Sequence, residues 1–241
     1  MTWHIQEAHI FFNPRAPQRE RLAVVHPALL RWIAAESPKT MRVLDVGCGN
    51  GRLTLATAPL AAEVIGLDRD GTALVLAQQR AAVANIANVR FLTADVEDLP
   101  YSALIGADSI DMVVANLCMS QAIITRAHTI LPVGGCLIFA ALHSAQWQET
   151  GRASRFAYDA AELRQLLERH GWRCEAMEID QEVLHLQKVA DLGHYFTTSP
   201  LRQRWQQDGR WEHLMRYITQ GGDRLTIRSH VLVKARKTSC C

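Results

Sequence analysis

A run of glycines between residues 47 and 51 is the part of this chain whose residue types and spacing could do chemistry most directly. The apolar segment 43–46 (VLDV) leads into 47–51 (GCGNG), and helical spacing follows. Glycines permit positive φ angles and let a ligand approach the backbone closely, and the first turn of the next helix leaves amides free to face that ligand. We therefore predict a ligand-binding loop formed by Gly47, Cys48, Gly49 and Gly51.

Two residues beside the glycines indicate what kind of ligand the loop holds. A dinucleotide loop, G-x-G-x-x-G, needs a glycine three places after its second glycine, and Arg52 stands there instead. Asp45, two places before the first glycine, would repel a pyrophosphate but suits a ligand that carries a positive charge. A carboxylate satisfied within the loop is the alternative interpretation of Asp45.

Apolar strands that alternate with amphipathic helices must position this loop. Strands are predicted at 41–46, 63–68, 89–95, 110–117, 134–142, 174–186 and 225–235. Such alternation is typical of a parallel sheet covered on both faces, and right-handed crossovers make it doubly wound. The predicted fold class is therefore α/β, with a doubly wound, seven-stranded sheet.

Two segments lie outside this alternation of strands and helices, and with them we interpret residues 1–241 as a single domain. Helical spacing within residues 1–40 predicts an N-terminal helix ending before Pro38. Residues 187–224 are too many for a hairpin loop and have helical spacing, so we expect a helical insert before the last strand. The core then comprises 41–186 and 225–237.

Composition and charge argue against several classes of partner. With 26 Lys and Arg against 24 Asp and Glu, the net charge of +2 gives no field for sequence-blind binding to nucleic acid or an anionic membrane. The longest apolar runs are shorter than the roughly 18–20 residues that cross a bilayer, and the N-terminus does not resemble a secretory signal. None of the six cysteines forms a CxxC pair, and no histidine pair has metal-ligand spacing. We expect a cytoplasmic protein without a metal.

The segment 45–51 resembles the nucleotide-methionine loop, D-x-G-x-G-x-G, of class I S-adenosylmethionine-dependent methyltransferases. The resemblance covers about 41–142 and implies a Rossmann-like fold with S-adenosylmethionine as cofactor. It also implies that residues 1–40 form a helical lid over the cofactor.

Polar residues at three further strand ends match positions that this family uses for its cofactor. Asp68 ends the second predicted strand, where a carboxylate can accept both ribose hydroxyls. Asp95 ends the third, where the family holds adenine, and Asn116 follows the fourth, beside the methionine part. A helix cap or a turn is the alternative for Asp68 and Asp95. The implied cofactor-binding set is Asp45, Gly47, Cys48, Gly49, Gly51, Asp68, Arg69, Asp95, Val96, Asn116 and Leu117.

The catalytic candidate is His143, which follows the fifth predicted strand and would serve as a base or as a polar contact with the substrate. The segment 116–119 (NLCM) lacks the D/N-P-P-Y/F motif of DNA-adenine and glutamine methyltransferases, which favours a small or carrier-tethered acceptor. The aromatics of 187–224 are predicted to line an apolar pocket or to form the core of the insert.

A second resemblance, to the malonyl-acyl-carrier-protein O-methyltransferases of biotin synthesis, rests on 12–16 (FNPRA), on 115–121 (ANLCMSQ) and on the helical insert. It implies a carboxylate acceptor, which needs no base, and an arginine that pairs with a free carboxylate, with Arg152 and Arg155 as candidates. Another small-molecule N-, O- or C-methyltransferase and a non-catalytic cofactor-binding scaffold are the alternatives, and the oligomeric state stays open.

Overall fold

The computed structural model describes residues 4–11, 25–36, 38–98, 100–105, 109–187, 189–197 and 200–239. The chain divides into two units. Unit 1 comprises Met1–Leu22, Leu142–Asp159 and Glu178–Val231, and unit 2 comprises Ala23–Ala141, Ala160–Met177 and Leu232–Cys241. The segment 12–16, which carries part of the second resemblance, lies outside the described residues.

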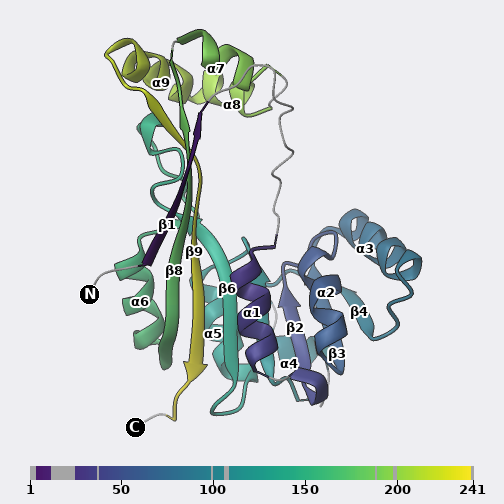
Figure 1. The fold of residues 1–241 in the computed structure, drawn as a ribbon. Coiled ribbons are helices and arrows are strands. Elements are labelled where there is room, and N and C mark those ends of the chain that lie inside the picture. The colour runs from purple at the N-terminus through teal and green to yellow at the C-terminus, as the bar shows by residue number, and fades with distance from the viewer. Residues whose placement is uncertain are drawn as a thin grey trace. The chain divides into compact units, whose positions relative to one another are not determined.

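Unit 2 is built on parallel strands in the order β4-β3-β2-β5-β6 (Figure 1). These are β2 Arg42–Val46, β3 Glu63–Asp68, β4 Val89–Thr93, β5 Met112–Asn116 and β6 Cys136–His143. From β2 the chain proceeds outward to β3 and β4, then returns to the other side of β2 for β5 and β6. The order therefore reverses between β2 and β5, and open α/β sheets bind ligands at the carboxyl ends of strands at such a switch point.

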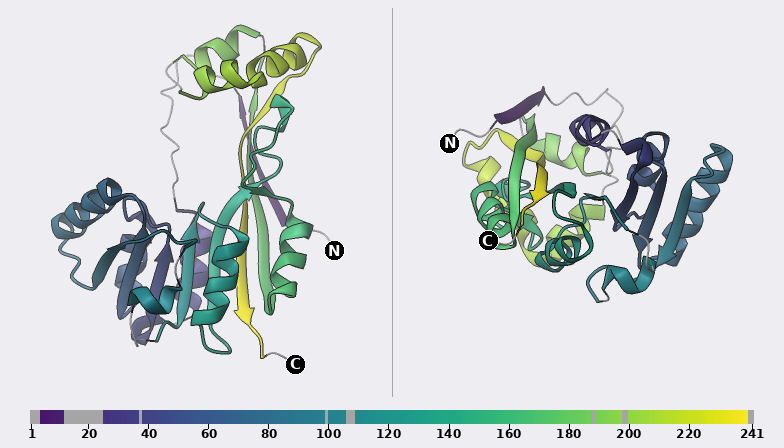
Figure 2. Two further views of the ribbon diagram at one scale, coloured as in Figure 1. Left: turned by 180° about the vertical axis from the view of Figure 1, so that it is seen from behind. Right: turned by 90° about the horizontal axis from the view of Figure 1, so that it is seen from below.

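Helices cover both faces of these strands. They are α1 Pro27–Ala35, α2 Arg52–Thr57, α3 Gly71–Val83, α4 Tyr101–Ile105, α5 Gln121–Ile130 and α6 Ala160–Arg169, with short 3-10 turns η1 Pro38–Thr40 and η2 Ala58–Leu60. In the view from behind, α4 and α5 lie on the face opposite to α1 and α2 (Figure 2). β2, β3 and β5 are buried on both faces, which explains why their sequences read as continuous apolar runs.

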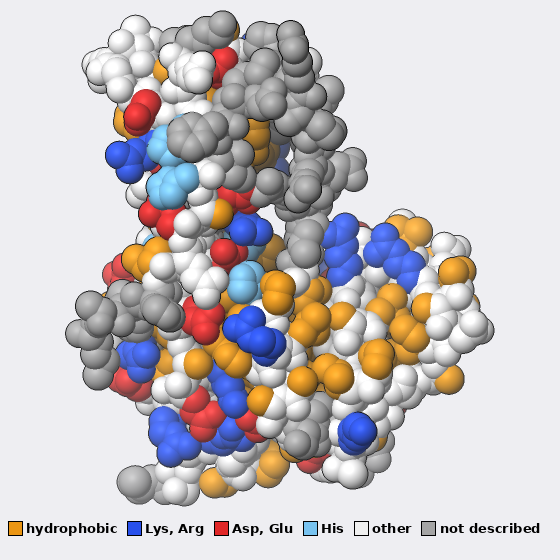
Figure 3. Space-filling view, viewed as in Figure 1, with side chains coloured by type: hydrophobic (Ala, Val, Ile, Leu, Met, Phe, Trp, Pro, Cys, Tyr) orange, Lys and Arg blue, Asp and Glu red, His pale blue; other side chains and the backbone are white. Residues whose placement is uncertain are grey.

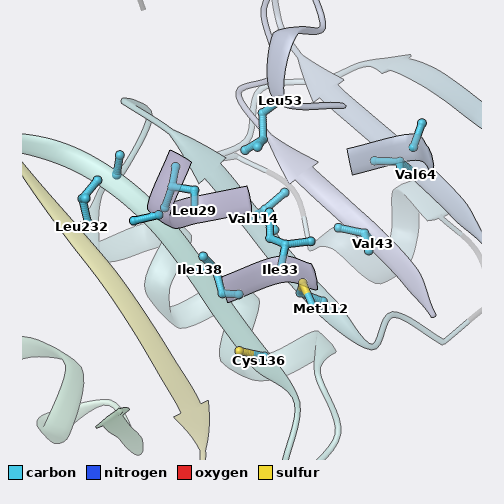
Figure 4. Packing of buried hydrophobic residues seen from close by; sticks show 13 residues of the cluster. Leu29, Ile33, Val43, Leu53, Val64, Met112, Val114, Cys136, Ile138 and Leu232 are labelled. Atoms are coloured by element: carbon cyan, nitrogen blue, oxygen red, sulfur yellow. The ribbon is translucent and has the colours of Figure 1, made fainter. Parts of the chain in front are cut away.

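One core cluster shows how α1 and α2 are held against the strands (Figure 4). Leu29 and Ile33 of α1 and Leu53 of α2 are buried among alternate residues of the strands. The strand residues in the cluster are Val43, Val64, Met112, Val114, Cys136, Ile138, Ala140 and Leu232. Partly buried apolar side chains at the edge of this cluster reach the surface over α1 and α2 (Figure 3).

Unit 1 contains a parallel pair of strands and the helical insert. β1 His4–Phe11 pairs with the second half of β8 Trp172–His185, from Glu178 to His185. β9 Arg224–Lys237 neighbours β8, and β7 Ala157–Tyr158 pairs with the end of β6. The remaining elements are η3 Gln148–Thr150, α7 Val189–Tyr195, α8 Pro200–Asp208 and α9 Arg210–Thr219. The paired strands follow the order β1-β8-β9-β6-β5-β2-β3-β4, and β7 lies off this path beside β6.

The doubly wound α/β fold, the seven predicted strands and the helical insert are confirmed, but nine strands are present among the described residues. The additional strands are β1 and β7. The helix of the predicted N-terminal lid is confirmed as α1. The helical prediction is wrong for residues 4–11, because their backbone groups pair with β8 and not within a helix. That residues 1–40 cover the cofactor stays a prediction.

None of the helices that the structure describes is long and apolar enough to cross a lipid bilayer.

Candidate functional site

The glycine loop turns sharply at the carboxyl end of β2. Gly47, Gly49 and Gly51 have φ angles of +69°, +51° and +80°, which side chains rarely tolerate. A Cβ atom on Gly47 would overlap the Sγ of Cys118, so only glycine fits there. The N–H of Cys48 donates to the Leu67 carbonyl at 2.9 Å, which ties the loop to β3. Gly51 is the N-cap of α2 and has no side chain with which to cap the first turn of that helix.

Asp45 is completely buried beside this loop. The Thr54 hydroxyl donates to its Oδ2 at 2.5 Å, while its Oδ1 is buried and has no hydrogen-bond partner among the described residues. Burial raises the pKa of Asp45 to about 7, and the Thr54 hydrogen bond opposes that rise. A positively charged group close to Asp45 would favour the ionised form.

Asp68, at the end of β3, holds the loop in place through both carboxylate oxygens. Its Oδ2 accepts the Gly49 N–H at 2.7 Å, and its Oδ1 accepts the Asp70 N–H at 2.9 Å. Asp70, rather than Asp68, caps α3, by accepting the N–H of Thr72 at 2.9 Å. The half-buried Asp68 carboxylate keeps further lone pairs with which it can accept hydroxyl groups.

Asp95 and Val96 follow β4. The Oδ1 of Asp95 accepts the N–H of Glu97 at 2.9 Å, which makes a local turn. Its Oδ2 lies 3.6 Å from the guanidinium of Arg69, a side chain that is 80% exposed, so this ion pair contributes little to stability. Val96 is buried, and its carbonyl accepts the Tyr101 hydroxyl at 3.1 Å.

Asn116 and Leu117 lie where β5 ends. Leu117 has a φ angle of +60°, a left-handed conformation that is strained for a leucine, and its N–H donates to the Ala140 carbonyl at 2.8 Å. The next residue, Cys118, packs against Gly47, and burial raises its thiol pKa to about 11. Cys118 and Thr54 cannot be placed in the site from the sequence, because only the fold brings them to the loop.

His143 ends β6 and belongs to unit 1. Its Nδ1 lies 2.9 Å from the hydroxyl of Ser229, which also accepts the Nε2 of Gln181 at 3.0 Å. Burial lowers the pKa of His143, and the charge of Asp159 opposes that effect. The sequence carries no signal for Ser229 or Gln181. They stand on β9 and β8, far from His143 along the chain, and only the fold brings the three residues together.

The other predicted acceptor-side residues lie apart from that network. Arg152 and Arg155 are exposed, and the guanidinium of Arg155 lies 4.6 Å from the ring centroid of Phe156. Phe196 and Trp205 are completely or almost completely buried, with ring centroids 5.1 Å apart. These insert aromatics form the core of the insert, together with Leu192, Leu214 and Leu225.

Acidic, histidine and cysteine side chains are the usual metal ligands in proteins. Within the described ranges, no group of three or more could hold a metal ion.

The methyltransferase-domain family matches residues 37–221. This chain belongs to that family. The predicted resemblance to class I S-adenosylmethionine-dependent methyltransferases is therefore confirmed, and the Rossmann-like fold agrees with it.

Curated relatives of this methyltransferase-domain protein are named for different acceptors. The chain is 31% identical over 146 residues to ribosomal protein L11 methyltransferase of Pseudomonas syringae pv. tomato, covering 59% of this chain and 47% of that protein. It is 28% identical over 179 residues to malonyl-acyl-carrier-protein O-methyltransferase of a Paenibacillus species, covering 66% and 63%. Ubiquinone biosynthesis O-methyltransferase of Paraburkholderia phymatum is 28% identical over 145 residues, covering 56% and 59%. The chain thus spans about half to just under two thirds of these relatives.

Solved structures share the fold of this methyltransferase-domain protein at low sequence identity. The YcgJ protein of Bacillus subtilis has a TM-score of 0.65 at 16% identity, covering 89% of this chain and all of that one. The cyclase SpnF has a TM-score of 0.61 at 19% identity, covering 95% and 86%.

Proposed function

We propose that this protein transfers a methyl group from S-adenosylmethionine to an oxygen acceptor, a carboxylate, on a small or carrier-tethered molecule. The observation that carries the proposal is the glycine loop at the switch point of the sheet, braced by Asp68 and adjoining the buried Asp45. Family membership supports the use of a methyl donor.

The residues around the loop fit the cationic cofactor. Asp45 has a buried oxygen with no partner in the described part of the chain, and a carboxylate so placed favours a positive charge nearby. Gly49 leaves the backbone open to a ligand, since a Cβ atom added there would have no closer neighbour than Asp68 Oδ2 at 4.0 Å. A dinucleotide would instead bring negative charge toward Asp45.

Asp68 and Asp95 would hold the nucleoside part of the cofactor. The Asp68 carboxylate, fixed by two backbone N–H groups, is oriented to accept the ribose hydroxyls. Asp95 would accept the exocyclic amine of adenine, with the Val96 amide donating to the ring. Asn116 and the strained Leu117 would line the methionine part.

S-adenosylmethionine, when bound, supplies a methyl group on a positively charged sulfur, which is already electrophilic. The chain therefore has to orient the acceptor and exclude water, and such positioning alone is able to supply roughly 7–11 kcal/mol of barrier reduction. A carboxylate acceptor arrives ionised, so it needs no general base.

Two observations support this acceptor class. The relatives named malonyl-acyl-carrier-protein O-methyltransferase and ubiquinone biosynthesis O-methyltransferase act on oxygen by their names. The segment Asn116-Leu117-Cys118-Met119 lacks the prolines and the aromatic that clamp a planar amino group.

The experiment is methyl transfer from tritium-labelled S-adenosylmethionine. We expect label in malonyl-pantetheine, recovered as an ester that mild base hydrolyses, and much less label in a catechol or in ribosomal protein. Transfer to the catechol alone or to the ribosomal protein alone would show that the acceptor is not a carboxylate and would identify the other acceptor class. Transfer to none of them, nor to any fraction of a cell extract, would favour a non-catalytic scaffold.

A further inference from the structure

A polar network in unit 1 surrounds one nitrogen of His143. The hydroxyl of Ser229, which is completely buried on β9, lies 2.9 Å from Nδ1, and the backbone N–H of Ala145 points at the same nitrogen from 3.4 Å. A backbone N–H is only ever a donor, so Nδ1 must accept. If Nδ1 carried a proton, two donors, that N–H and the Ala145 N–H, would point at each other without an acceptor between them.

One glutamine fixes the direction of the Ser229 hydroxyl, and a second glutamine holds the Ser229 backbone. Gln181 Nε2 donates to the Ser229 oxygen at 3.0 Å, and Gln146 Oε1 accepts the Ser229 backbone N–H at 3.1 Å. The hydroxyl oxygen thus accepts from Gln181, and its own hydrogen has Nδ1 of His143 as acceptor. The bonds that reach the Ser229 hydroxyl and Nδ1 together place the lone pair of the imidazole on Nδ1.

The remaining nitrogen of His143 is then defined by chemistry. A neutral imidazole with its lone pair on Nδ1 carries its proton on Nε2, and Nε2 makes no hydrogen bond to any described residue. Burial keeps the ring neutral, and Asp159 is the charged group that opposes this effect. Nε2–H is therefore a donor ready for an oxygen of a ligand.

We infer that Ser229 is a positioning residue that fixes His143 as the Nε2–H tautomer, so that His143 donates a hydrogen bond to a carboxylate or carbonyl oxygen of the methyl acceptor and does not act as a general base. The ligand part of this inference rests on the proposed function, whereas the tautomer does not. It resolves the two roles that the sequence left open for His143 in favour of the polar contact.

Nitrogen NMR of the full-length protein tests the tautomer without any substrate. In ¹⁵N-labelled protein at pH 7, we expect His143, assigned by loss of its signals in His143→Gln, to show a protonated Nε2 and an unprotonated Nδ1. Ser229→Ala should mix the tautomers and raise the His143 pKa by about half to one unit, the effect of one lost neutral hydrogen bond. Ser154→Ala, the matched control in the same unit, should change neither. A protonated Nδ1, or an unchanged spectrum in Ser229→Ala, would overturn the inference.

Malonyl-pantetheine with S-adenosylhomocysteine tests the donor role. We expect the Nε2 resonance to shift on addition, and an unmoved resonance would refute the contact even if methyl transfer succeeds. In turnover, His143→Gln keeps an amide donor near Nε2 and should hold KM within about threefold, whereas His143→Asn should raise KM tenfold or more with kcat little changed. Equal loss of kcat in both variants, with loss of a pH limb, would identify a base instead. If methyl transfer fails entirely, the tautomer result still stands and only the proposed function falls.

Discussion

At the scale of single residues, Asp68 connects the conformation of the loop to ligand recognition, because its carboxylate accepts a loop N–H and still has lone pairs to spare. We predict that Asp68→Ala weakens binding of S-adenosylhomocysteine by roughly 1–3 kcal/mol, the cost of lost charge-assisted hydrogen bonds. Calorimetric titration measures this. Asp70→Ala is the matched control, since it removes the cap of α3 and should lower stability by about 1 kcal/mol while affinity changes little. Equal affinity loss in both variants would assign Asp68 a structural role alone.

Asp45 gives the ligand-free protein a stability that depends on pH. Its pKa is about 3.8 in the unfolded chain and about 7 when buried, so the folded state binds the extra proton between these values. The free energy of unfolding contributed by this group is therefore present below pH 4 and lost as pH rises through 7. The full effect is on the order of 4 kcal/mol.

Asp45→Asn should remove that pH dependence. Urea unfolding at pH 4.5 and pH 7.5 measures it: the wild type should lose more stability than Asp45→Asn between the two values. Parallel losses in the two proteins would show that the buried carboxyl ionises as easily as in water.

Gly47 is the loop position at which both the backbone conformation and the contact with Cys118 favour glycine. Gly47→Ala should lower stability and cofactor affinity, because its Cβ overlaps Cys118 Sγ in addition to the strain of a φ of +69°. Gly134→Ala is the control for strain alone, since Gly134 has a φ of +84° and no atom within 4 Å of its added Cβ. Thermal unfolding should rank Gly47→Ala below Gly134→Ala. Gly47→Ala combined with Cys118→Gly, which removes both the Sγ and the Cβ that the added atom overlaps, should recover part of the difference. If Gly47→Ala is more stable than Gly134→Ala, the loop rearranges to accept the added methyl group and the prediction is wrong.

At the scale of elements, the sequence predicts best the strands that are buried on two faces. β2, β3 and β5 read as apolar runs because helices cover both sides, and the residues just after them were found for that reason. β1 was missed because an edge strand needs no apolar run: its pairing with β8 depends on backbone bonds, and Ile5 is 54% exposed. Thr54, Cys118 and Ser229 were missed because only the fold brings them to their partners. Those partners, Asp45, Gly47 and His143, lie 9, 71 and 86 residues away along the chain.

The helical insert depends on its own aromatic core. Trp205→Ala should lower the free energy of unfolding by about 3–5 kcal/mol, because this completely buried ring packs on Trp147 and Phe196. Trp211→Ala, at a partly buried ring of the same cluster, should cost clearly less. Equal small losses in urea unfolding would favour an open pocket lined by Trp205 over a packed core.

At the scale of the whole molecule, the methyltransferase-domain family matches residues of both units. We propose that unit 2 binds the cofactor and that the polar network of unit 1 contacts the acceptor. Within unit 2, the sheet reverses its order between β2 and β5, and the residues proposed for the cofactor follow β2, β3, β4 and β5. The central claim is that these strand ends bind a sulfonium nucleoside.

Isothermal titration calorimetry of the purified chain with S-adenosylmethionine, S-adenosylhomocysteine and NAD tests that claim most directly. We predict micromolar binding of the first two, weakened in Asp68→Ala, and no heat with NAD. Absence of binding to both sulfur nucleosides at millimolar concentration, or preferential binding of NAD, would contradict the account.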